Sequence, residues 1–62
     1  MCDLNVFLLH GDSREQVMDS VTRIVVDGDS IELTGILGEQ KTVTGYIKEI
    51  NISTTEALIV AK

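Results

Sequence analysis

The sequence lacks proline, and it contains only one cysteine, one histidine, one phenylalanine and one tyrosine. A single cysteine, Cys2, excludes an internal disulfide, and a lone thiol is typical of a reducing compartment. Two aromatic residues are too few for a convincing base-stacking surface. A single histidine also leaves little from which to build a catalytic set, and no Ser-His-Asp arrangement or phosphate-binding glycine loop is recognisable. The sequence therefore predicts a protein that is not an enzyme.

Basic residues are also few, at five against ten acidic ones, which gives a net charge of −5. Nucleic-acid-binding proteins normally concentrate lysine and arginine on one surface. Here the basic residues are scattered, so we expect no nucleic-acid partner, and a small RNA-binding β-barrel is kept only as an alternative. No apolar stretch approaches the ~20 residues of a membrane span, and no signal-peptide pattern opens the chain. We therefore expect a cytoplasmic protein with no membrane partner.

The shortness of the chain limits its core. Sixty-two residues predict one domain over 1–62, and a chain of this size buries only ~60% of its extended surface. Without a disulfide, a second copy or a bound metal is an attractive source of additional stability.

The residues that are abundant are β-formers. Short runs of valine, isoleucine and threonine alternate with glycine and aspartate. The predicted strands are 4–9, 14–18, 21–26, 31–34, 42–47 continuing to 52, and 56–61, with turns at 10–13, 19–20 and 51–55 and a loop at 35–41. These elements predict an all-β fold, a small antiparallel SH3-like barrel of about five to six short strands.

Three details of this arrangement can be tested. A hairpin around Asp27-Gly28 should pair Val26 with Ile31 and Ile24 with Leu33, so that these four apolar side chains share one face. The apolar alternation changes phase near Lys48 and Glu49, which predicts a bulge or bend within residues 45–48. In the last strand, Leu58 and Val60 are expected to face the core.

Cys2 is the strongest candidate for chemistry. If Met1 is removed, Cys2 offers a thiol and an α-amine to the same cation; if Met1 stays, the backbone amide can serve as the nitrogen donor. A thiolate with nitrogen donors suits nickel, copper or zinc better than calcium or magnesium. The alternative is that Cys2 is simply a small hydrophobic residue.

Two further residues are weaker candidates. His10 is about eight residues from Cys2, or ~26 Å along an extended strand, so the two cannot share a site within that strand. Asp3 could be a ligand, a hydrogen-bond acceptor for a ligand, or an exposed charge. Whether either residue contributes is left open by the sequence.

Several segments resemble one known family. Met1-Cys2 before the strand with Val6-Phe7-Leu8, the Asp27-Gly28 hairpin, the loop Ile36-Leu37-Gly38-Glu39 and the strand segment Gly45-Tyr46-Ile47-Lys48-Glu49-Ile50 together resemble CooT, a small nickel-binding accessory protein of carbon monoxide dehydrogenase. The similarity covers nearly the whole chain. Asp3, where relatives often have an apolar residue, and Leu37, in place of a phenylalanine, depart from the pattern.

The resemblance implies an SH3-like β-barrel homodimer that holds one nickel(II) ion between protomers through Cys2 of each, as a metallochaperone would. It also implies a nickel enzyme or its maturation factors as partner. An alternative is a HypC-like assembly chaperone, which shares the Met-Cys start. HypC-like chains usually continue with a Pro-Gly step and end in a helix, whereas this sequence has no proline and a predicted final strand.

Overall fold

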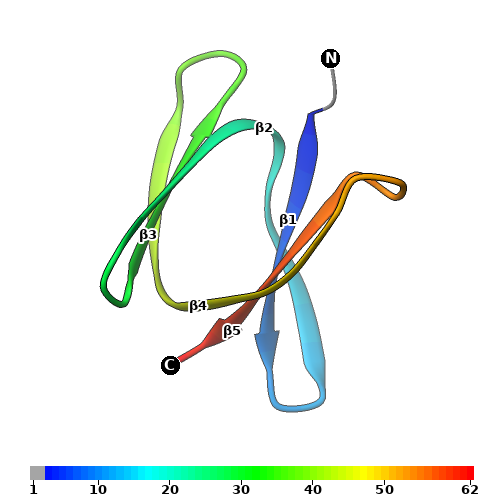
Figure 1. The fold of residues 1–62 in the computed structure, drawn as a ribbon, viewed down its shortest axis with the longest axis vertical. Helices are drawn as coiled ribbons and strands as arrows, with labels where there is room; N and C mark the ends of the chain where they lie inside the picture. The colour runs from blue at the N-terminus through cyan, green and yellow to red at the C-terminus, as the bar shows by residue number, and fades with distance from the viewer. Residues whose placement is uncertain (1–2) are drawn as a thin grey trace.

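A computed structural model describes residues 3–62 and confirms the all-β barrel. Its strands are β1 (Leu4–His10), β2 (Ser13–Asp27), β3 (Ser30–Gly35), β4 (Gln40–Asn51) and β5 (Glu56–Ala61). They close into a ring in the order β1-β2-β3-β4-β5 (Figure 1). Neighbouring strands are antiparallel except for β1 and β5, which run parallel and close the ring.

The expected turn at Asp19-Ser20 is wrong, because residues 13–27 form one long strand. The first half of β2 pairs with β1 and the second half with β3. The strand bends between these halves, where Ser20 has a φ of 52° and the register shifts on either side of Val21. A polar pair in a β-rich sequence has therefore produced a barrel corner and not a chain reversal.

The predicted hairpin is confirmed. Val26 lies opposite Ile31 and Ile24 lies opposite Leu33, across a turn at Gly28-Asp29. Gly28 has a φ of 61°, the left-handed conformation that an Asp-Gly turn supplies. The loop between β3 and β4 is shorter than expected, since β3 runs to Gly35 and β4 begins at Gln40.

The predicted irregularity in β4 is also confirmed. The register against β5 shifts between Ile47 and Glu49, so Lys48 is the extra residue of a bulge. Gly45 lies just before it, where a Cβ atom would collide with the carbonyl oxygen of Val60. Glycine at this position allows β4 and β5 to approach closely as β4 changes from pairing with β3 to pairing with β5.

The core of the barrel consists of seven buried apolar residues: Val6, Val21, Ile31, Leu33, Val43, Ala57 and Ile59. The expectation that Leu58 and Val60 face inward is wrong, because Ala57 and Ile59 are fully buried and successive strand residues point to opposite sides. Residues 57–61 are apolar throughout, so alternation could not determine which side is inner.

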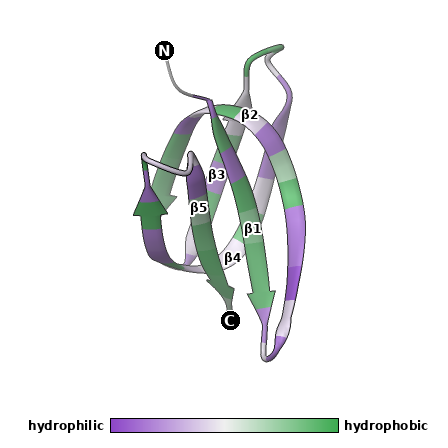
Figure 2. Ribbon diagram, turned by 90° about the vertical axis from the view of Figure 1, so that its right-hand side faces the viewer, coloured by the Kyte–Doolittle hydropathy of each residue, from purple (hydrophilic) through white to green (hydrophobic). Residues whose placement is uncertain are grey.

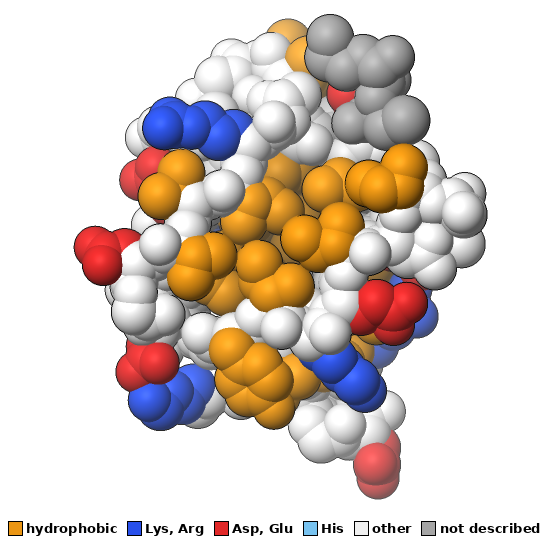
Figure 3. Space-filling model, viewed as in Figure 1, with side chains coloured by type: hydrophobic (Ala, Val, Ile, Leu, Met, Phe, Trp, Pro, Cys, Tyr) orange, Lys and Arg blue, Asp and Glu red, His pale blue; other side chains and the backbone are white. Residues whose placement is uncertain are grey.

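One side of the barrel is incompletely covered. Ile50 lies opposite the buried Ala57 and so shares its inward side, yet it is 47% exposed. Figure 3 shows apolar side chains gathered in the middle of the face viewed in Figure 1. Apolar side chains around the buried core are therefore exposed on this face, although residues 3–62 enclose no pocket.

Candidate metal centre

The predicted metal ligand, Cys2, lies outside the described residues, and the structure locates the strand that follows it. Leu4 begins β1 and pairs with Val21 of β2, which in turn pairs with Gly35 at the end of β3. With ~4.8 Å between neighbouring strands, Gly35 lies about 10 Å from Leu4. The start of β1 therefore lies at the same end of the barrel as the β3–β4 loop (Figure 1).

That loop presents apolar side chains on a well-bonded backbone. Ile36 is 58% exposed and Leu37 is 86% exposed. The Ile36 amide donates to the Ser20 carbonyl at 2.9 Å, and the Gly35 amide donates to the Glu39 carbonyl at 2.8 Å. The Glu39 side chain accepts from the Leu37 amide at 3.1 Å. The end of the barrel from which β1 starts thus carries an ordered, exposed apolar loop.

Asp3 is half-buried and immediately precedes β1. Asp3 therefore lies at the same end of the barrel as the β3–β4 loop. Within the described range 3–62, no three or more His, Cys, Asp or Glu side chains are grouped closely enough to hold a metal ion.

The structure separates His10 from the start of β1. His10 is the last residue of that strand, six steps or ~20 Å from Leu4. Its Nε2 lies 3.6 Å from Oε1 of Glu15, and both side chains are more than half exposed. The geometry supports the expectation that His10 cannot join a site at the start of its own β1.

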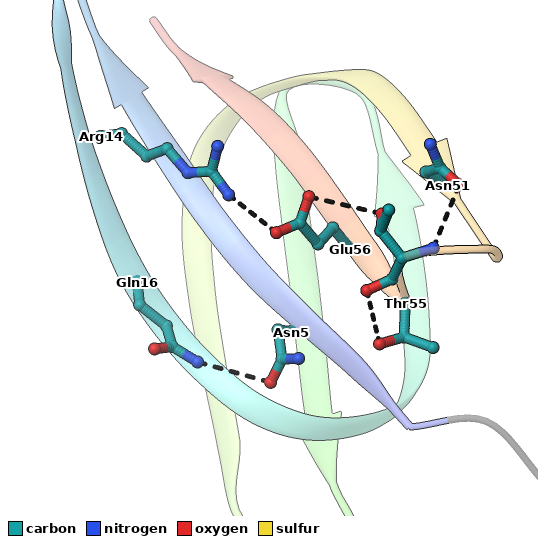
Figure 4. Close-up of polar contacts among 7 residues, drawn as sticks. Asn5, Arg14, Gln16, Asn51, Thr55 and Glu56 are labelled. Atoms are coloured by element: carbon teal, nitrogen blue, oxygen red, sulfur yellow. Dashed lines mark hydrogen bonds and ion pairs between the residues drawn. The ribbon is translucent and has the colours of Figure 1, made fainter.

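A polar network crosses the outside of the barrel between β2 and β5. The Arg14 guanidinium donates to Glu56 at 2.8 Å, and Glu56 also accepts from the Thr54 hydroxyl at 3.4 Å (Figure 4). The Arg14 Cζ lies 4.1 Å from the centroid of the Phe7 ring on the intervening strand β1. The arginine thus spans three strands, and its stacking on Phe7 places that ring on the outer surface.

Sequence reasoning missed this outer surface. Phe7 and Leu9 of β1, Leu58 and Val60 of β5, and Tyr46 of β4 lie on the side of the sheet opposite to the core. The signal was available, since residues 6–9 and 57–61 are apolar without alternation, a pattern typical of strands covered on both sides.

The described residues form a small closed β-barrel, and the one cysteine of the sequence comes two residues before the first strand. The family described as CO dehydrogenase accessory protein CooT matches residues 1–60. The chain belongs to this CooT family, and its resemblance to it in sequence is confirmed.

The fold agrees with that assignment. A crystal structure ascribed to CooT from Carboxydothermus hydrogenoformans superposes with a TM-score of 0.90 at 21% identity, covering 98% of both chains. At this identity the match shows a shared fold. No curated protein matches the sequence. Among residues 3–62 there is no helix with the length and apolar character needed to cross a membrane.

Proposed function

We propose that this protein is a nickel-binding accessory protein, similar in role to a metallochaperone, and that it is not itself an enzyme. The observation that carries the proposal is the family match, which spans residues 1–60 and so includes Cys2. Carbon monoxide dehydrogenase is a nickel enzyme, so an accessory protein with an N-terminal thiolate is suited to handle nickel for such an enzyme or its maturation factors.

In this proposal two protomers hold one nickel(II) ion between them, and Cys2 is a ligand from each. Two thiolates and two nitrogen donors form a set that nickel(II) accepts in square-planar geometry, whereas zinc prefers a tetrahedral arrangement. The nickel is cargo in this proposal, and a position before the first strand would leave it open to transfer. Asp3, which follows Cys2 in the sequence and is half-buried, is a candidate neighbour of the ion.

The proposal is tested by titrating nickel(II) into the purified protein and recording both thiolate-to-nickel charge-transfer absorption and mass under non-denaturing conditions. We expect one ion per dimer. Cys2→Ala should abolish the absorption, and the control His10→Ala should retain it, because His10 lies at the far end of β1. Equal nickel affinity in Cys2→Ala and the parent protein would overturn the proposal, as would a stoichiometry far from one ion per dimer.

A further inference from the structure

The β3–β4 loop carries the most exposed large apolar side chain among residues 3–62. Leu37 is 86% exposed, and its neighbour Ile36 is 58% exposed. The Gly38 amide donates to the Gly35 carbonyl at 3.0 Å, so Ile36 and Leu37 occupy the two central positions of a tight turn. Figure 2 shows the hydrophobic tip of this loop at the same end of the barrel as the start of β1. We refer to Ile36 and Leu37 as the apolar tip.

The backbone of the apolar tip is fixed by hydrogen bonds to its neighbours. The Ile36 amide donates to the Ser20 carbonyl of β2 at 2.9 Å, and the Leu37 amide donates to the Glu39 carboxylate at 3.1 Å. That carboxylate lies over Gly35, where a Cβ atom would collide with Oε1 of Glu39. Because ordering a loop costs conformational entropy, an exposed leucine on an ordered turn is suited to a contact that forms on binding.

The chain start is within reach of the apolar tip. Leu4 lies about 10 Å from Gly35, across the spacings from β1 to β2 and from β2 to β3. Cys2 precedes Leu4 by two residues, and Leu37 follows Gly35 by two residues. Since two residues span up to about 7 Å, the Leu37 side chain can contact an ion that is bound at Cys2.

Charges of both signs lie near the apolar tip. Asp3 and Asp19 adjoin the paired start of β1 and the corner of β2, and Glu39 follows the tip itself. The basic residues Arg23 and Lys41 lie opposite positions 34 and 33 of β3. These opposite charges offset one another at a distance, and the apolar tip is uncharged. Its effect on a bound cation is therefore to exclude water.

Excluding water from one side of a bound ion should slow the loss of that ion. The attraction between a thiolate and a cation is stronger at low dielectric constant, and apolar groups around a metal site control the access of solvent to it. Two side chains supply only a small part of the ~800 Å² that each partner contributes to a stable protein interface. They are nevertheless large enough to shield one side of a single ion.

We propose that the apolar tip packs over the metal ion bound at Cys2 and slows its release. This inference rests on the proposed function, since it takes nickel(II) as the cargo. Leu37 supplies the cover, and Glu39 is a positioning residue, because it acts through the Leu37 amide. The ligands select the metal, whereas the apolar tip determines how long the ion stays bound.

The test is the rate at which excess EDTA removes nickel(II) from the loaded protein, followed by the loss of thiolate-to-nickel absorption. Leu37→Ser should speed release about 10-fold, because the short polar side chain no longer excludes water. Leu37→Met restores an apolar side chain of similar size and should restore slow release. Circular dichroism should show the same fold in all of these proteins, since Leu37 is largely exposed.

Val26→Ser is the matched control. Val26 is 55% exposed, close to the value for Ile36, but it lies opposite Ile31, which is four residues or ~13 Å from Gly35 along β3. This variant should release nickel at the parent rate. Equal release from Leu37→Ser and the parent, or the same acceleration in Val26→Ser, would overturn the inference.

The positioning role of Glu39 is tested in the same assay. Glu39→Ala leaves the Leu37 amide without its side-chain acceptor and should speed release severalfold. Glu39→Gln removes the charge but keeps an oxygen that accepts from this amide, so release should stay slow. If Glu39→Gln releases nickel as fast as Glu39→Ala, the carboxylate acts through its charge and the positioning role is wrong.

Nickel binding by the parent protein separates this inference from the proposed function. The Leu37 and Glu39 variants should still bind nickel, because all of them retain Cys2. A parent protein that binds no nickel would overturn both proposals. A parent protein that binds one ion per dimer, and releases it no more slowly than Leu37→Ser does, would overturn only the role of the apolar tip.

Discussion

Replacing two neighbouring residues of β5 should lower the free energy of unfolding by very different amounts, because one lies inside the barrel and the other outside. Ile59 is fully buried, and Leu58 is half-buried on the outer face. Ile59→Ala removes three carbon atoms from the core, or about 2.4 kcal/mol at ~0.8 kcal/mol for each. The cavity left behind raises the expected cost to about 3–4 kcal/mol. Leu58→Ala leaves no enclosed cavity, so the cost to the monomer should be about 1 kcal/mol.

The free energy of unfolding is measured from urea titrations followed by circular dichroism, since the chain has no tryptophan. A domain of this length has a total stability of roughly 3–9 kcal/mol, so Ile59→Ala should lower the urea midpoint sharply at every protein concentration. Equal costs for the two variants would refute the assignment of inner and outer sides in β5.

Two further predictions concern the closure of the barrel. Gly45→Ala should cost about 2–3 kcal/mol, because its Cβ would collide with the Val60 backbone; the control Gly28→Ala has open space around it and should cost about 1 kcal/mol through its left-handed backbone alone. Thermal unfolding measures both, and equal losses would contradict the close approach of β4 and β5. Removing the exposed Arg14–Glu56 pair by Arg14→Ala should cost only about 0.5–1 kcal/mol, and the loss should shrink in 1 M salt. A large, salt-independent loss would instead assign the arginine's contribution to its contact with Phe7.

The sequence predicted best where one face of a strand is apolar and the other is not. The β2–β3 hairpin could be placed in its correct register because that register puts Ile24, Val26, Ile31 and Leu33 on one face, and slipping by one residue would mix the faces. The bulge in β4 could be placed because the apolar alternation changes phase near Lys48 and Glu49. In both cases the two-residue alternation of side chains along a strand indicated which residues face the core.

The same reasoning failed where apolar and polar residues do not alternate along the strand. Residues 57–61 are apolar throughout, so nothing in the strand itself distinguishes Ala57 and Ile59 from Leu58 and Val60. Which of these two sides faces the core depends on how β5 pairs with β1 and β4. The Asp19-Ser20 corner was misread for a related reason. Local polarity signals that a chain bends, whereas whether it reverses depends on which distant strands pair with each half.

The candidate metal site, too, could be predicted from the sequence only in part. The sequence identified Cys2 as the residue with the most distinctive chemistry, and its place before β1 follows from the strand prediction. A single thiol is nevertheless an incomplete ligand set, so the chain's own sequence could not define the whole site. The missing information lies in which surface meets a second copy.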